Sequence, residues 1–149
     1  MSRRIIVSSL AGATVLGAAG AYAFAAQASE SGPALRDATA NYAAPAEGRD
    51  GSLTFTARVS DDSGVRDVKV LAWPDSMQQA PTKQEMAAVE SAACTPSGGG
   101  AAMCRYTVPV TGSDVAESPG GVWNVAVLVT SKDGGNAFVP RAAAFTTGL

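Results

Sequence analysis

The fold is decided by one stretch of the chain, Gly121-Val122-Trp123-Asn124-Val125-Ala126-Val127-Leu128-Val129-Thr130. Apolar side chains recur at every second position, which is the repeat of a β-strand. One face carries Trp123, Val125, Val127 and Val129, and the other carries Val122, Ala126 and Leu128. A strand that is apolar on both faces needs cover on both sides.

The same alternation continues on either side of this stretch. Residues 53–60 place Leu53, Phe55, Ala57 and Val59 on one face. Further strands are predicted over residues 65–73, 104–110 and 137–146, with a weaker first strand over residues 35–42. Six or seven strands without βα alternation predict an all-β fold, an antiparallel β-sandwich.

One short helix is predicted inside this series of strands. Thr82 and Glu85 have the spacing of a capping box, and Met86, Val89 and Ala93 follow at helical spacing up to Cys94. We expect this helix to lie on the outer face of a sheet, with Met86 and Val89 over Leu71 or Leu128. It would then cover the second apolar face of the strands at 65–73 and 121–130.

Two segments resemble bacterial immunoglobulin-like domains of exported and surface proteins. The first is the turn Asp61-Asp62-Ser63-Gly64-Val65, and the second is the strand Gly121–Val127 with the hairpin Asp133-Gly134-Gly135-Asn136. The resemblance spans roughly residues 53–145 and implies an immunoglobulin-like sandwich with an inserted helix. It implies almost nothing about function. Cys94 and Cys104 are too close in sequence to be the inter-sheet pair of antibody domains.

Residues 1–28 have the features of a secretory signal peptide. A basic start with Arg3 and Arg4 precedes 22 uncharged residues, Ile5 to Ala26, and Ala26-Gln27-Ala28 is a small-residue cleavage site. Cleavage there leaves residues 29–149 as one domain; Ala23-Phe24-Ala25 is an alternative site. With this leader, the whole chain is similar to small exported proteins of high-GC bacteria that have no assigned activity.

Two alternatives concern this leader. The uncharged run is long enough to be a retained membrane anchor, but its many Ala and Gly residues and the cleavage site favour removal. After cleavage we expect no association with the membrane. The pair Arg3-Arg4 suits either the twin-arginine route or the general export route.

Composition excludes several classes of function. The 149 residues contain no histidine, which removes Ser-His-Asp, Cys-His and His-metal sites. Loss of the leader reduces the 11 basic residues to 9 and leaves 13 acidic ones, a formal charge of −4. A mildly acidic domain without a basic cluster does not suit nucleic acid, and we expect no nucleic-acid partner.

The two cysteines predict a structural disulfide. Cys94 and Cys104 enclose nine residues that include Gly98-Gly99-Gly100, and the chain has no further cysteine to complete a metal site. Export from the reducing cytoplasm favours the oxidised pair. The same residues would brace a loop, 95–103, that could be presented to a partner.

Four turn residues are candidates for a calcium site, namely Asp61, Asp62, Asp133 and Asn136. Calcium needs six or more oxygen ligands, and the chain has no D-x-D-x-D loop. Asp and Asn also accept backbone hydrogen bonds in tight turns, which is the simpler reading. We therefore expect neither a metal nor a cofactor.

Four aromatic residues could stack against a glycan if they shared an exposed face: Tyr42, Trp73, Tyr106 and Trp123. Aromatic residues on alternating strands more often fill a core, and Trp123 is the central candidate for that role. Trp73, beside Pro74 at the end of its strand, is the one whose exposure needs checking.

These observations predict a protein that is not an enzyme. The acidic residues form no facing pair of the kind that glycosidases use, because Asp61 and Asp62 are adjacent and Glu85 and Glu90 are five residues apart. We expect an exported binding or structural module of the cell envelope or extracellular space, with an unknown protein or glycan partner. The alternative is a secreted protease inhibitor that presents the disulfide-braced 95–103 loop.

Overall fold

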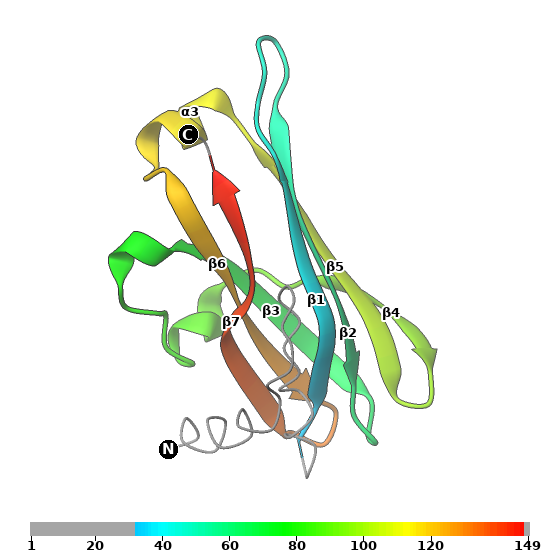
Figure 1. The fold of residues 1–149 in the computed structure, drawn as a ribbon. Coiled ribbons are helices and arrows are strands. Elements are labelled where there is room, and N and C mark those ends of the chain that lie inside the picture. The colour runs from blue at the N-terminus through cyan, green and yellow to red at the C-terminus, as the bar shows by residue number, and fades with distance from the viewer. Residues whose placement is uncertain (1–31, 148–149) are drawn as a thin grey trace.

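The computed structural model describes residues 32–147. These residues form seven strands in two antiparallel sheets that pack face to face (Figure 1). The strands are β1 Ala34–Ala43, β2 Gly51–Ser60, β3 Val65–Pro74, β4 Ala93–Gly98, β5 Ala101–Val110, β6 Gly121–Ser131 and β7 Asn136–Thr147. The predicted all-β antiparallel sandwich is confirmed. The signal peptide predicted over residues 1–28 lies outside the described residues.

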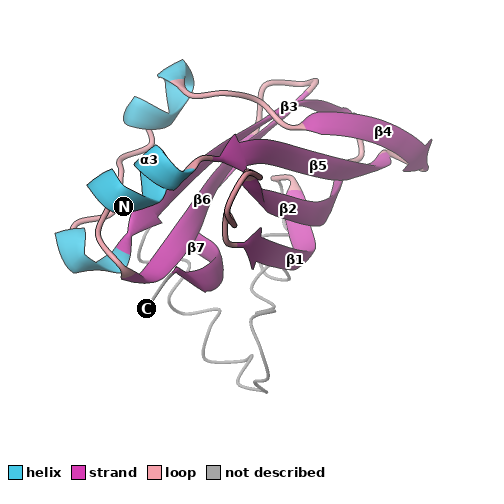
Figure 2. Ribbon diagram, turned by 90° about the horizontal axis from the view of Figure 1, so that it is seen from above, coloured by secondary structure: helices cyan, strands magenta, loops and turns pink. Residues whose placement is uncertain are grey.

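One sheet has the strand order β1-β2-β5-β4, and the other has the order β3-β6-β7. The edge strands β1 and β7 contact one another along one side of the sandwich. The other two edges, β3 and β4, lie together on the opposite side (Figure 2). These two edges border the candidate site.

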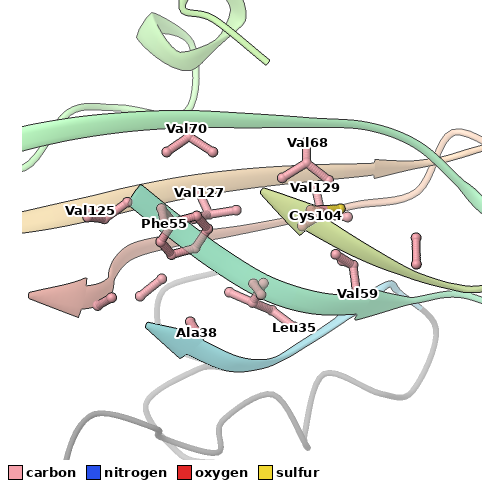
Figure 3. Close-up of a cluster of buried hydrophobic side chains, with 14 residues drawn as sticks. Leu35, Ala38, Phe55, Val59, Val68, Val70, Cys104, Val125, Val127 and Val129 are labelled. Carbon is pink, nitrogen blue, oxygen red and sulfur yellow. The ribbon is translucent and has the colours of Figure 1, made fainter. Parts of the chain in front are cut away.

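The main core fills the space between the sheets (Figure 3). The inner face of β2 contributes Phe55, Ala57 and Val59, each 0% exposed, as the alternation of residues 53–60 predicts. The facing sheet contributes valine side chains from β3 and from β6. Those labelled in Figure 3 are Val68, Val70, Val125, Val127 and Val129.

A second, smaller core lies on the outer face of the β3-β6-β7 sheet. Trp73, Met86 and Ala126 are buried there, and Leu71 and Leu128 pack against them. The predicted cover of this face by Met86 is therefore confirmed. Burial of a Met side chain is worth about 1.5–3 kcal/mol, so this contact helps to hold the 85–92 segment on the sheet.

The predicted helix up to Cys94 is wrong in its length. Residues Glu85–Ala88 form a single 3-10 turn, η2, which begins with the predicted capping box and is followed by extended chain. The N–H of Val70 then donates to the carbonyl of Glu90, at 3.1 Å, and the N–H of Ala92 donates to the carbonyl of Val68, at 2.8 Å. The helix stops because the edge of β3 supplies these hydrogen bonds instead.

The described α-helix lies elsewhere, at α3, Gly112–Glu117, between β5 and β6. Its N-cap is Thr111, whose hydroxyl accepts from the N–H of Asp114 while the Asp114 carboxylate accepts from the N–H of Thr111. A further 3-10 turn, η1, covers Asp75–Met77 after β3. The inserted helix of the sequence prediction is thus replaced by two 3-10 turns and one short α-helix.

Candidate functional site

A disulfide-linked hairpin forms the outer edge of the four-stranded sheet. Cys94 of β4 stands directly opposite Cys104 of β5, and their sulfurs are bonded at 2.07 Å. The predicted disulfide is confirmed. The sequence does not anticipate β4, because Thr95, Pro96 and Gly98 read as a loop.

The predicted presentation loop is therefore mostly paired strand. Thr95 pairs with Met103, and Pro96 pairs with Ala102. The reversal of the chain is left to three glycines, Gly98–Gly100, all of which have positive φ. The inhibitor alternative stays a prediction, but the segment it needs has the backbone of a hairpin rather than of a long exposed loop.

A trough of about 490 Å³ lies beside this hairpin, between the edges of the two sheets. One wall is the beginning of β3, from Val65 to Val68, and the other is β4 with Cys94, Pro96 and Gly98. The volume falls within the range of about 300–1,000 Å³ that is usual for ligand sites. The trough is thus the candidate binding site of the domain.

Both ends of the trough are closed by backbone hydrogen bonds. At one end, the crossing segment 90–92 is tied to β3 by the bond from the Ala92 N–H to the Val68 carbonyl. At the other end, the N–H of Asp61 donates to the carbonyl of Gly100, at 3.0 Å. Gly100 has φ +81°, and a Cβ there would collide with the Asp61 carbonyl oxygen, so this end requires glycine.

The charged groups at the trough are of both signs. Arg66 and Lys132 lie at one rim, where the Arg66 guanidinium donates to the Lys132 carbonyl at 3.2 Å. Neither side chain takes part in the ion pairs of residues 32–147. Asp67 lies 3.7 Å from the Lys69 ammonium and accepts from the Ser91 hydroxyl, whereas Asp62 is exposed.

The crossing segment is also held by Tyr106, whose hydroxyl donates to the Glu90 carboxylate at 2.7 Å. Burial raises the pKa of Tyr106 to about 12, and the hydrogen bond and negative charge of Glu90 act in the same direction. Tyr106 also packs against the main core. Its role here is to join the core to the wall of the trough.

Of the four calcium candidates, Asp61, Asp62 and Asp133 lie in two turns at one end of the sandwich, and Asn136 is the first residue of β7. Ser63 links the turns, because it donates its N–H and its hydroxyl to Asp61 and accepts from the Asp133 N–H at 3.1 Å. Asp62 and Asn136 are exposed. No group of three or more acidic or cysteine side chains within residues 32–147 is arranged to hold a metal ion.

The carboxylate of Asp133 is occupied within its own turn. It accepts from the Ser131 hydroxyl at 2.6 Å and from the Gly135 N–H at 3.0 Å. These bonds lower the pKa of Asp133, with the Ser131 hydroxyl as the largest cause. They are the backbone and turn contacts of the simpler reading, so the geometry adds no support to the calcium hypothesis.

Trp73 does not offer a surface for stacking. Its side chain is 3% exposed, and its indole N–H donates to the Pro140 carbonyl at 3.0 Å. The Arg141 guanidinium covers the ring at 4.7 Å from its centroid and lies 3.6 Å from Asp75. The ring is therefore buried beneath Arg141 and the second core, as the core reading of this residue predicts.

Trp123 lies at the end of the main core and not at its centre, so that part of the prediction is wrong. It is partly exposed, and its ring stacks on Phe145, which in turn stacks on Tyr42, at centroid distances of 6.1 Å and 5.7 Å. Because Trp123 stands near the start of β6, its indole N–H reaches the Pro119 carbonyl. The alternative of a glycan-stacking platform finds no support, since Trp73 and Tyr106 lie elsewhere.

Comparison with known protein families places this chain in a family. The model of DUF5707, a family of unknown function, matches residues 35–129, which is more than half of the chain. The chain belongs to this family. The matched residues 35–129 of this chain include both cysteines and both walls of the trough, whereas Lys132 lies beyond them. A search of curated proteins found no match.

The trough of this DUF5707 domain is the feature that sequence reasoning missed. Its two walls, 65–68 and 94–98, are separated by a segment that was expected to be helical. A sequence signal does exist, since a disulfide between residues only ten apart suits two neighbouring strands of a hairpin, as Cys94 and Cys104 are. Within residues 32–147, the structure has no helix long and apolar enough to cross a membrane.

Proposed function

We propose that this DUF5707 chain is an exported, non-catalytic binding or structural module of the cell envelope or extracellular space. The observation that carries the proposal is the disulfide between Cys94 and Cys104, because such bonds persist where thiols are not kept reduced. The uncharged leader and its cleavage site support the same destination. The absence of histidine from the sequence excludes the forms of acid–base and metal catalysis that depend on that residue.

We also infer that the sandwich is immunoglobulin-like. The orders β1-β2-β5-β4 and β3-β6-β7 correspond to the ABED and CFG sheets of a constant-type immunoglobulin domain. Domains of this architecture commonly act by binding, although the fold alone does not define a ligand. The resemblance to exported proteins of high-GC bacteria agrees with this assignment and is part of the proposal.

Export is tested by fractionation of a bacterial host that expresses the full-length chain. We expect the protein outside the cytoplasm, shortened to a start at or near Ser29. A matched variant that lacks residues 2–28 should stay in the cytoplasm, and Arg3→Lys/Arg4→Lys separates the two export routes. Recovery of the full-length, unprocessed chain in the cytoplasm would refute the proposal.

The protease-inhibitor alternative rests on the exposed outer side of β4, where Thr95, Pro96 and Ser97 are open to solvent. A panel of secreted serine proteases separates it from the leading proposal. The leading proposal predicts no inhibition by the oxidised protein. Nanomolar inhibition that disappears on reduction would instead establish the alternative.

A further inference from the structure

We propose that the trough binds a short extended peptide that carries a carboxylate, by antiparallel pairing with the free edge of β3 at Val65–Asp67. This inference rests on the proposed function, since it gives the binding module its site and the chemistry of its partner. The three features that support it are the free strand edge, the closed ends of the trough, and the two cations at its rim.

The edge of β3 already accepts a strand at its other half. The crossing segment 90–92 runs antiparallel to it, with Lys69 opposite Ser91 and hydrogen bonds at 3.1 Å and 2.8 Å on either side. This segment then leaves for β4, and residues 65–67 continue the same edge along the trough, with a β-bulge at Arg66 in their pairing with β6. An extended guest would continue the pairing that 90–92 begins, which is the mode called β-augmentation.

The opposite wall explains why the guest pairs with β3 and not with β4. Pro96 stands in the middle of β4 and has no N–H to donate, which is a common protection of an edge strand against pairing. The guest therefore gains its contacts from the backbone edge of β3 and from the exposed rim, because Val68 and Ala102, at 0% and 4% exposure, are already covered by the protein.

A long strand could lie in the trough only if the trough were open at both ends, and it is closed at both. The hydrogen bonds at Ala92 and at Gly100 close the trough, and its wall on β3 spans the four residues 65–68. At about 3.3 Å per residue, such a wall matches a guest of roughly four residues. The site therefore fits a short segment, and a second copy of this chain would have to insert a comparably short loop.

Charge defines the chemistry of the guest. Arg66 and Lys132 are both exposed at the rim and lie outside the ion pairs of residues 32–147. Asp67 is balanced by Lys69 at 3.7 Å, which leaves Asp62 as the opposing charge. The rim therefore has a net positive balance in a domain that is acidic as a whole, and a carboxylate on the guest complements it.

The test uses nitrogen-15-labelled protein produced from the full-length sequence and two tetrapeptides, acetyl-Val-Glu-Val-Glu-amide and its counterpart with Lys in place of Glu. We expect the Glu peptide to shift the amide signals of Val65–Val68 and to bind more tightly than the Lys peptide. Raised salt should weaken the binding. Methylation of alternate backbone nitrogens of the Glu peptide should abolish it, because the guest then loses its donors.

The variant Arg66→Glu/Lys132→Glu should weaken binding of the Glu peptide by about tenfold. The matched control is Arg49→Glu in the distant β1–β2 hairpin, which should leave the affinity unchanged. If the double variant does not fold, Lys132→Ala provides the same comparison, because Lys132 is exposed and its aliphatic part lies over Gly64.

Three results would overturn the inference. The first is the absence of amide shifts at millimolar Glu peptide, the second is equal binding of the Glu and Lys peptides, and the third is a dimer that occludes residues 65–67. Each of these results leaves the export experiment untouched. An exported, processed protein that fails to bind the peptide would therefore refute this site and retain the proposed function.

Discussion

Removal of the disulfide should destabilise the domain by an amount that depends mainly on the length of the loop it closes. In Cys94→Ala/Cys104→Ala, the unfolded chain loses a covalent loop that joins residues ten apart. The chain-entropy relation gives about 3 kcal/mol for a loop of this size. Cys104 is 1% exposed, so loss of its sulfur adds about 1 kcal/mol. We expect a total loss of about 3–4 kcal/mol and a fall in Tm of roughly 10–15 °C.

Urea denaturation followed by tryptophan fluorescence measures this loss. The wild-type protein in excess reductant is the matched control, because it lacks the covalent link but keeps both sulfur atoms. The control should lose about 3 kcal/mol, and the double variant slightly more. Hydrogen exchange should accelerate most in β4, which pairs only with β5. A loss below about 1 kcal/mol in both would refute the reasoning.

Four further substitutions test other contacts. Tyr42→Phe should stabilise the fold by about 1 kcal/mol in urea denaturation, because the Tyr42 hydroxyl is buried without a partner among residues 32–147. Gly99→Ala, at φ +61° with open space around it, should lower the free energy of unfolding by about 1–2 kcal/mol. Gly100→Ala should lower it by about 2–4 kcal/mol, because the new Cβ meets the backbone of Asp61. Equal losses would contradict the closed end of the trough. Since the folded-state pKa of Tyr106 is raised to about 12, its contribution to stability is complete below pH 10 and is lost between pH 10 and 12. Absorbance titration should show a lower pKa in Glu90→Gln, and an unchanged one would refute this contact.

The strands were predictable because their alternation is local. Residues 53–60 alternate between buried and less buried positions, so their own side chains reveal the inner face of β2. In residues 121–130 the apolar repeat marks a strand that is buried on both faces, with residues 124–127 all buried. The second apolar face of β6 also indicated an outer cover, which the structure supplies with Met86. The disulfide followed from the number and spacing of the cysteines.

The helix predicted up to Cys94 does not form, because its residues also have hydrogen-bond partners outside the helix that sequence spacing does not reveal. Its capping box forms, but the edge of β3 offers the segment 90–92 two backbone hydrogen bonds that end the helix. Pairing between segments that are distant in sequence thus overrides local helical propensity. Trp123 is partly exposed because it is the third residue of β6, beyond the buried residues that begin at Asn124.

The candidate site could not be predicted for the same reason. The trough exists because β3 and β4 are edges of different sheets that lie on the same side. The order of strands in the sheets decides which edges meet, and the alternation within a strand carries no information on that order. Arg66 and Lys132 are 66 residues apart in the chain and come together only through this topology.

The central claim, a processed and oxidised sandwich outside the reducing cytoplasm, is tested most directly by intact mass after alkylation. Full-length protein is expressed in a bacterial host, and its extracytoplasmic fraction is treated with iodoacetamide under denaturing conditions without reductant. The account predicts a chain that begins at or near Ser29 and carries no alkyl group, because Cys94 and Cys104 are bonded to one another. A chain that retains residues 1–28, or one that is alkylated at both cysteines, would contradict it.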